Sequence, residues 1–181
     1  MIAPLKLFGR LGNSLFQYAF LYAYAKDNGL DWYYQDPKFF KGHEEEIRQL
    51  FGQDIHKIDM VAIHVRRGDY VNNPFYVDLS KTDYYERAIS QFKGEEFLVF
   101  SDNIDWCKKM FKGKEFTFSE GNSEIEDLNM MAGCKGIIMA NSSFSWWGAF
   151  LGDKNKRVIA PKEWFTDTKM KVNLPKQWER I

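Results

Sequence analysis

Short apolar runs alternate with segments of helical hydrophobic spacing along the chain, most regularly after Met60. Strands are expected at 61–65, 97–100, 116–118, 136–140 and 157–160, and helices at 83–92, 103–111, 124–134 and 142–151. An aromatic-rich tail follows the last strand. Strands that alternate with helices of about ten residues predict an α/β fold with a doubly wound parallel sheet.

The first sixty residues show a sparser pattern. A strand at 5–8, a glycine turn and a helix at 15–25 are followed by a strand at 30–34 and a polar helix at 44–51. We therefore expect a reduced amino-terminal α/β part at 1–58 and a Rossmann-like domain at 59–181. The absence of a linker also fits one compact unit.

Polar residues before two of the helices are candidate caps. Ser80 or Thr82 is expected to cap the helix at 83–92, and Ser101 or Asp102 the helix at 103–111.

Composition limits the classes of partner. The 25 Lys and Arg residues balance the 25 Asp and Glu residues, so no net positive field attracts nucleic acid or an anionic membrane. Cys107 and Cys134 show no paired spacing, which indicates core residues in a reducing compartment and no zinc site. The amino-terminal apolar run is too short for a signal peptide, and no stretch approaches the ~20 apolar residues of a membrane span, so a cytoplasmic protein is expected.

Three clusters follow predicted strands, where parallel sheets bind ligands. In His64-Val65-Arg66-Arg67-Gly68-Asp69-Tyr70 a strand runs into two guanidiniums, which match phosphate as a planar fork of donors. Strand alternation directs His64 and Arg66 to one face, so Arg66 is expected to reach a ligand while Arg67 braces Asp69 or a second phosphate oxygen. The alternatives are a structural salt bridge and, for His64, a core histidine.

The other two clusters are weaker signals. Gly9-Arg10-Leu11-Gly12-Asn13 is a glycine loop before a helix, but it matches no known dinucleotide or Walker pattern. Asn141-Ser142-Ser143-Phe144-Ser145 places hydroxyls and N–H groups at a helix start, which suits an anion or simple capping. Trp146 and Trp147 are expected in the core.

Together these clusters resemble a known family. Gly9–Ala19, His64–Tyr70 and Asn141–Ala149 are similar, in order, to the successive motifs of α-1,2-fucosyltransferases, glycosyltransferase family 11. Further similarities are Ser101-Asp102, Asp127-Leu128 and the segment Val158–Phe165. The resemblance implies a GT-B-like fold and metal-independent, inverting transfer of L-fucose from GDP-fucose to a sugar hydroxyl of a glycan acceptor, with no cofactor.

The resemblance also implies roles for individual residues. Arg66 would hold the β-phosphate, Ser143 and Ser145 the phosphates, and His64 and Asp127 the guanosine; further donor contacts would come from Arg10, Asn13, Arg67, Asn141 and Ser142. Candidate proton acceptors are Asp69, Asp78 and the departing phosphate itself.

The chain departs from the family in one respect. Only Phe20 to Ile63 separate the glycine loop from the arginine motif, so most of the amino-terminal half, which contacts acceptors, is missing, and Ser14 replaces a glutamine. The alternative function is therefore a catalytically impaired GDP-sugar-binding module. A homodimer is one way to cover apolar surface at 32–34 or 39–40.

Overall fold

The computed structural model describes residues 9–28, 41–52, 54–170 and 172–181. The chain divides into two compact units, Met1–Asp54 and Ile55–Ile181, whereas the sequence placed the boundary between residues 58 and 59. The strands expected at 5–8 and 30–34, and the segments 32–34 and 39–40 suggested for dimer contacts, lie outside the described residues.

In the first unit, two helices are joined by charged side chains. Helix α1 spans Leu11–Asn28 and helix α2 spans Glu44–Phe51, as predicted for the second. Glu46 accepts hydrogen bonds from Lys26 and Tyr22, each at 2.7 Å, and these two donors lower the pKa of Glu46 to about 2. Three consecutive glutamates in the first turn of α2 also favour a helix start there, because they face its positive dipole end.

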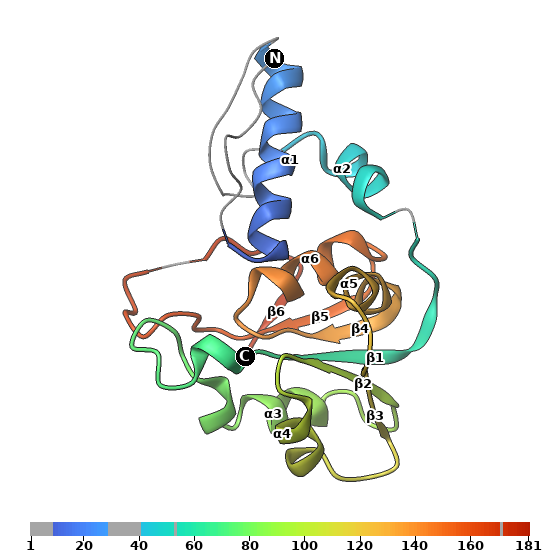
Figure 1. Cartoon of the computed structure of the whole chain (residues 1–181), viewed down its shortest axis with the longest axis vertical. Coiled ribbons are helices and arrows are strands. Elements are labelled where there is room, and N and C mark those ends of the chain that lie inside the picture. The colour runs from blue at the N-terminus through green and yellow to red at the C-terminus, as the bar shows by residue number, and fades with distance from the viewer. Residues whose placement is uncertain (1–8, 29–40, 53, 171) are drawn as a thin grey trace. The chain divides into compact units, whose positions relative to one another are not determined.

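The second unit contains one six-stranded sheet in which all neighbouring strands are parallel. The strand order is β3-β2-β1-β4-β5-β6 (Figure 1). The strands are β1 Ile58–Val65, β2 Phe97–Ser101, β3 Phe116–Phe118, β4 Cys134–Ile138, β5 Arg157–Ala160 and β6 Glu179–Arg180. This order confirms the predicted doubly wound, Rossmann-like sheet. The direction of winding reverses between β1 and β4.

Helices cover both faces of this sheet. Helices α3 and α4 lie on one face and α5 and α6 on the other (Figure 1). Their bounds are Tyr84–Ser90 for α3, Ile104–Met110 for α4, Glu124–Gly133 for α5 and Ser143–Leu151 for α6, and two short 3-10 helices, η2 Gly68–Tyr70 and η3 Leu79–Lys81, follow β1.

Side chains of β1 alternate between the two helical layers. Val61, Ile63 and Val65 join the core cluster that contains Tyr84 and Tyr85 of α3. The intervening residue His64 faces α6, where its ring lies 5.4 Å from that of Phe144. The period-two pattern of the strand therefore decides which face each residue of the arginine motif reaches.

The cap prediction for helix α4 was wrong, whereas that for helix α3 was met in part by Thr82. Helix α4 is capped by Asn103, whose side chain accepts from the N–H of Trp106, while Asp102 contacts the arginine motif. Helix α3 has Asp83 at its N-cap position, and Thr82 accepts from the N–H of Tyr84 at 3.3 Å. Strand β6 was also missed in sequence, since two residues carry no periodic signal.

Helix α6, which carries the serine cluster, is held against the sheet by buried aromatic side chains and by Lys156. Trp146 and Trp147 are in the core, as predicted, and so are Cys107 and Cys134. The Lys156 ammonium donates to the carbonyls of Ala132 at 3.0 Å and Gly148 at 2.9 Å, near the ends of α5 and α6. A cation there complements the negative ends of both helix dipoles, although burial lowers the pKa of Lys156 to about 8.

Candidate functional site

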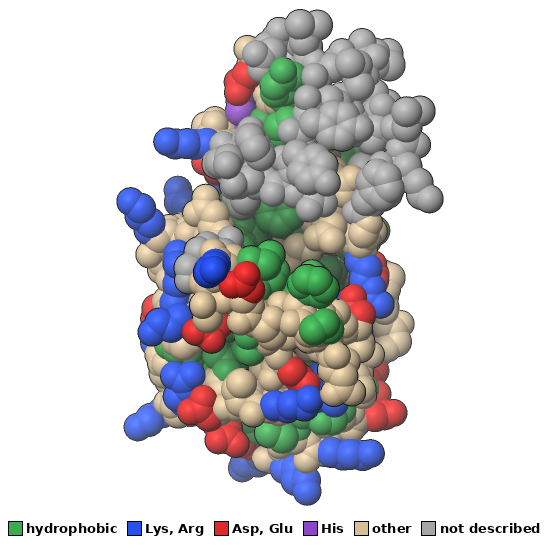
Figure 2. Space-filling model, turned by 90° about the vertical axis from the view of Figure 1, so that its left-hand side faces the viewer, with side chains coloured by type: hydrophobic (Ala, Val, Ile, Leu, Met, Phe, Trp, Pro, Cys, Tyr) green, Lys and Arg blue, Asp and Glu red, His purple; other side chains and the backbone are tan. Residues whose placement is uncertain are grey.

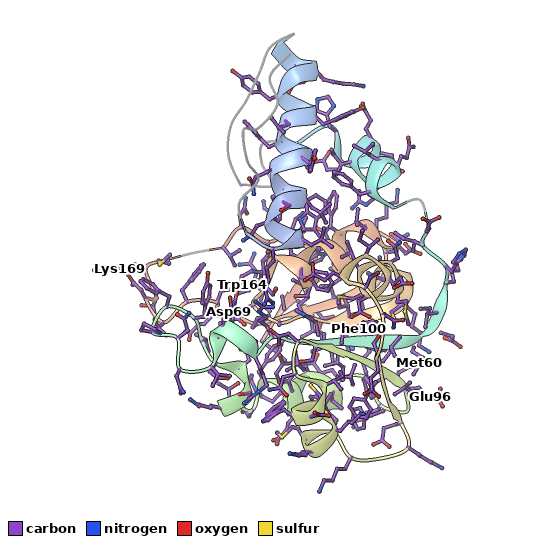
Figure 3. All side chains as sticks on the ribbon, in the orientation of Figure 1. Met60, Asp69, Glu96, Phe100, Trp164 and Lys169 are labelled. Carbon is purple, nitrogen blue, oxygen red and sulfur yellow. The ribbon has the colours of Figure 1, made fainter. Side chains whose placement is uncertain are left out.

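The point where the strand order reverses collects two of the predicted clusters. Strand β1 leads into Arg66-Arg67-Gly68-Asp69, and its neighbour β4 leads towards Asn141-Ser142-Ser143. Asp69 lies at the carboxyl edge of the sheet, whereas Met60 and Glu96, near the strand starts, lie at the opposite edge (Figure 3). Ligands of doubly wound sheets bind at such a reversal, outside the carboxyl ends of the strands.

Arg66 is held between two carboxylates. One terminal nitrogen of its guanidinium pairs with Asp69, and the other pairs with Asp102 at 2.9 Å. The side chains differ in exposure, at 11% for Arg66, 20% for Asp102 and 61% for Asp69. The Arg66 guanidinium also lies 5.4 Å from the centre of the Tyr70 ring. The Arg66 guanidinium, which is largely buried, thus pairs with one partly buried and one solvent-exposed carboxylate.

Arg67 points to the other layer, as strand alternation predicted. Its guanidinium lies 4.1 Å above the Trp106 ring of α4 and donates to the hydroxyl of Ser80. The expectation that Arg67 braces Asp69 was wrong, because Asp69 pairs with Arg66 instead. Arg67 therefore anchors the loop to helix α4.

Asp102 is a site residue that sequence reasoning assigned to the wrong role. Besides Arg66, its carboxylate accepts from the backbone N–H of Arg67 at 2.9 Å. A Cβ atom at Gly68 would lie 2.5 Å from the same carboxylate, so only glycine allows this approach. The sequence did contain one indication of this role. Asp102 directly follows strand β2, and β2 ends at the same edge of the sheet as β1.

His64 is a buried, neutral imidazole. It is 5% exposed, and burial and the nearby Arg66 lower its pKa to about 3. Its Nδ1 atom is buried and has no hydrogen-bond partner among the described residues. Such an atom can serve a ligand that reaches the end of β1.

The burial of His64 predicts a specific acid sensitivity. The unfolded chain protonates this imidazole near pH 6.5 and the folded chain does not, so folding stability should fall as the pH drops from about 6.5 towards 3. Between pH 7.5 and pH 5 the contribution is about 2 kcal/mol of unfolding free energy. In urea titrations at both pH values, His64→Gln should lose less stability on acidification than the wild type. The exposed His56 supplies the control: His56→Gln should behave like wild type, and equal pH dependence of all three proteins would contradict the assignment.

Two residues of the serine cluster, Asn141 and Ser145, are buried and bond to carbonyl groups inside the fold. Asn141 is 1% exposed and donates to the carbonyls of Val77 and Trp164, each at 2.9 Å. Ser145 is fully buried, and its single hydroxyl donor is shared between the carbonyls of Ala140 at 3.0 Å and Ser142 at 3.1 Å. These placements give Asn141 and Ser145 structural roles and do not agree with the direct donor contacts that the resemblance implied for them.

Two residues remain at the start of α6. Ser142 is the N-cap, and its hydroxyl accepts from the N–H of Phe144 at 3.3 Å. Ser143 is the first helical residue and is half-buried. The amino terminus of α6, which is the positive end of the helix dipole, lies at the same edge of the sheet as Arg66, which suits an anionic ligand.

Asp127 lies in the first turn of α5, after strand β3. Its carboxylate accepts from the hydroxyl of Ser119 at 2.6 Å, and burial raises its pKa. Ser123 and Glu126 form a capping box that fixes this helix start. The sheet thus places Asp127 at the same edge as Arg66 but two strands further along.

Arg10 and Asn13 belong to the first unit. Gly9 adopts a φ of +87°, and a Cβ atom there would lie 2.6 Å from the Asn13 side-chain nitrogen, so the turn into α1 needs glycine. The carbonyl of Arg10 accepts from the N–H of Ser14 at 3.0 Å, in the first turn of the helix.

Within 9–28, 41–52, 54–170 and 172–181, no group of three or more His, Cys, Asp or Glu side chains is arranged to hold a metal ion. No described helix is both long enough and apolar enough to cross a membrane.

Comparison with known proteins agrees with the resemblance seen in sequence. The family model described as Glycosyl transferase family 11 matches residues 10–181. An Escherichia coli protein named alpha-1,2-colitosyltransferase is 34% identical over 177 residues, covering 82% of this chain and 61% of the relative. The E. coli O-antigen biosynthesis glycosyltransferase WbnK is 33% identical, covering 74% and 54%. A bovine galactoside alpha-(1,2)-fucosyltransferase 2 is 30% identical, covering 50% and 30%. The chain therefore spans about three fifths or less of the length of these relatives.

Proposed function

Because the chain belongs to glycosyl transferase family 11, we propose that it transfers L-fucose from GDP-fucose to a hydroxyl of a galactoside, with inversion and without a divalent metal. An α-1,2 linkage is proposed from the names of the relatives. The observation that carries the proposal is Arg66, a nearly buried guanidinium at the reversal point of a Rossmann-like sheet.

In this proposal the donor diphosphate lies across the ends of β1 and β4. Arg66 contacts the β-phosphate, and the start of α6 at Ser142 and Ser143 contacts further phosphate oxygens. The guanosine extends towards His64 and Asp127. Arg10 and Asn13 of the first unit are assigned to the pyrophosphate or fucose by resemblance alone.

The chemistry needs positive charge where the donor breaks. The acceptor oxygen forms a bond to C1 of fucose while the bond from C1 to the phosphate oxygen breaks, and its electron pair moves onto the β-phosphate of GDP. The sugar passes through a state with oxocarbenium character. Arg66 stabilises the charge that develops on the phosphate, a task that a divalent cation performs in other sites.

Asp69 is the proposed general base, and donor binding is what frees it for this role. Its carboxylate is the more exposed partner of Arg66, so a phosphate oxygen displaces it more easily than it displaces Asp102. Once released, Asp69 is a carboxylate beside the reacting centre and accepts the proton of the acceptor hydroxyl. The leaving phosphate is the alternative acceptor. Asp78 is less suited, because it bonds to Ser80 at the start of η3.

A second donor follows from one relative. The 34% identical E. coli protein is named for transfer of colitose, a sugar that lacks the hydroxyl at C3 of fucose. GDP-colitose is therefore the competing donor, and the binding module that holds a GDP-sugar without transfer is the competing function.

One assay separates these candidates. Lactose is incubated with GDP-fucose or GDP-colitose in the presence of a chelator, and the product is identified by its anomeric proton signal. We expect an α-linked fucosyl product from the β-linked donor, at a rate unchanged by the chelator. Transfer from GDP-colitose but not from GDP-fucose would show that GDP-colitose is the donor. Binding of GDP-fucose without turnover would show that the protein is a GDP-sugar-binding module.

A further inference from the structure

A pocket of about 160 Å³ lies at the carboxyl ends of β5 and β6, at the same edge of the sheet as the candidate donor site. Its wall combines aromatic rings with hydrogen-bonding side chains, among them Lys162, Glu163, Trp164, Phe165, Thr168 and Arg180. All of these residues belong to the unit Ile55–Ile181, so this unit forms the pocket by itself.

The wall is fixed by backbone pairing. The N–H of Lys162 donates to the carbonyl of Ile181 at 2.9 Å, and strand β6 pairs with β5 so that Arg180 lies beside Ala160. The guanidinium of Arg180 donates to the carbonyl of Leu174 at 3.3 Å, across the pocket wall. Strand β6, although only two residues long, thus places a cationic group at the pocket.

A second pairing ties the pocket to the loop of the arginine motif. The N–H of Val77 donates to the carbonyl of Trp164 at 3.1 Å, and the N–H of Thr166 donates to the carbonyl of Phe75 at 3.0 Å. The buried amide of Asn141 donates to the carbonyls of both Val77 and Trp164. Trp164 and Asp69 accordingly lie at the same edge of the unit (Figure 3).

Aromatic rings form a continuous path from the pocket to Arg66. Phe165 lines the pocket, and its ring lies 5.7 Å from the Tyr76 ring. Tyr76 stacks on Tyr70 at 4.1 Å with an angle of 9° between the rings, and the Arg66 guanidinium lies 5.4 Å from Tyr70. No step of this path exceeds 5.7 Å. Figure 2 shows this edge of the unit, where hydrophobic side chains are exposed among charged ones.

We propose that this pocket binds a hexopyranose unit of the glycan acceptor, an inference that rests on the proposed transferase function. A closed protein cavity of about 150 Å³ holds one benzene molecule, so this open pocket of about 160 Å³ has room for one sugar ring at most. The C–H face of a pyranose packs on aromatic rings, whose faces carry partial negative charge. Lys162 and Arg180 donate to its hydroxyls and Glu163 accepts from them, while Thr168 can do either.

The proposal predicts where a galactoside binds. In ¹H–¹⁵N spectra of the full chain, lactose titrated to tens of millimolar should shift the amide signals of Thr168 and Met170 and leave those of α3 unchanged. Phe165→Ala and the near-isosteric Thr168→Val should weaken these shifts, and Glu86→Gln on the exposed face of α3 should not. Lactose shifts that avoid residues 162–180, or no shifts at all, would overturn the assignment.

Kinetics test the same pocket independently. Phe165→Ala should raise the KM for lactose about tenfold, as loss of one aromatic contact does, while the KM for GDP-fucose stays within about twofold of wild type. A GDP titration in the same samples separates the two hypotheses. If GDP binds but lactose does not shift the signals of the pocket residues, the acceptor assignment is wrong and the proposed donor site stands. If GDP does not bind, the proposed donor function is wrong, and the lactose shifts still show whether the pocket binds a galactoside.

Discussion

Arg66→Ala is expected to lower kcat for fucosyl transfer by a hundredfold or more. Loss of one preorganised charge partner of a transition state typically costs about two to three orders of magnitude in rate. The KM for the acceptor should change little, because the proposed partner of Arg66 is the donor phosphate and Arg66 does not line the pocket beside Phe165. Steady-state assays with each substrate varied in turn measure both effects.

Two further variants show whether the loss of activity is specific to the Arg66 guanidinium. Arg66→Lys keeps the charge but loses the planar fork that pairs with Asp102, so we expect a smaller loss of about tenfold. Arg87→Ala removes an exposed arginine of α3 that pairs with Asp83 at the surface, and its rate should match the wild type. Transfer by Arg66→Ala at the wild-type rate would exclude the proposed role.

Asp102→Ala is expected to lower kcat/KM for GDP-fucose between about tenfold and a hundredfold, although Asp102 is not expected to touch the substrate. Asp102 fixes both the Arg66 guanidinium and the N–H of Arg67, and a displacement of about 1 Å at a reacting group can cost two orders of magnitude. Asp102→Asn keeps an acceptor for the Arg67 N–H but loses the ion pair, so its loss should be smaller.

Controls distinguish positioning from a general loss of structure. Asp105→Asn changes an exposed carboxylate of helix α4, just after Asp102 in the chain, and should leave kcat/KM and GDP binding by the folded protein unchanged. A purely structural role would lower the stability of Asp102→Asn while the folded fraction kept its GDP affinity. A positioning role instead weakens GDP binding by folded protein, so an unchanged GDP dissociation constant would contradict it.

The parallel sheet was accessible from sequence because its signal is local. Each central strand is a short apolar run bounded by a helix, and the predicted bounds 116–118 and 157–160 match β3 and β5. The family motifs placed Arg66 and Ser143 after strands that the fold makes neighbours. Strand order itself depends on contacts between distant segments, which periodicity does not contain.

The site was predicted less completely because its contacts cross strands. Asp102 reads as a helix cap in isolation and becomes a partner of Arg66 only when β2 pairs with β1. Ser145 has the residue type of a phosphate ligand, yet it bonds to carbonyls inside the fold. Strand β6 became visible only through its pairing with β5, and with it the pocket at Arg180. Residue type thus limited the set of candidate site residues, and pairing between distant strands determined which of them lie in the site.

The most direct test of a GDP-sugar site at Arg66 is isothermal titration of GDP and UDP into the wild type and Arg66→Ala, without added metal. The account predicts that GDP binds the wild type, that UDP does not, and that Arg66→Ala binds GDP at least about tenfold more weakly, since a charge-assisted phosphate contact is worth about 1.5–3 kcal/mol. Equal GDP affinity of wild type and Arg66→Ala, or no GDP binding by the wild type, would contradict it.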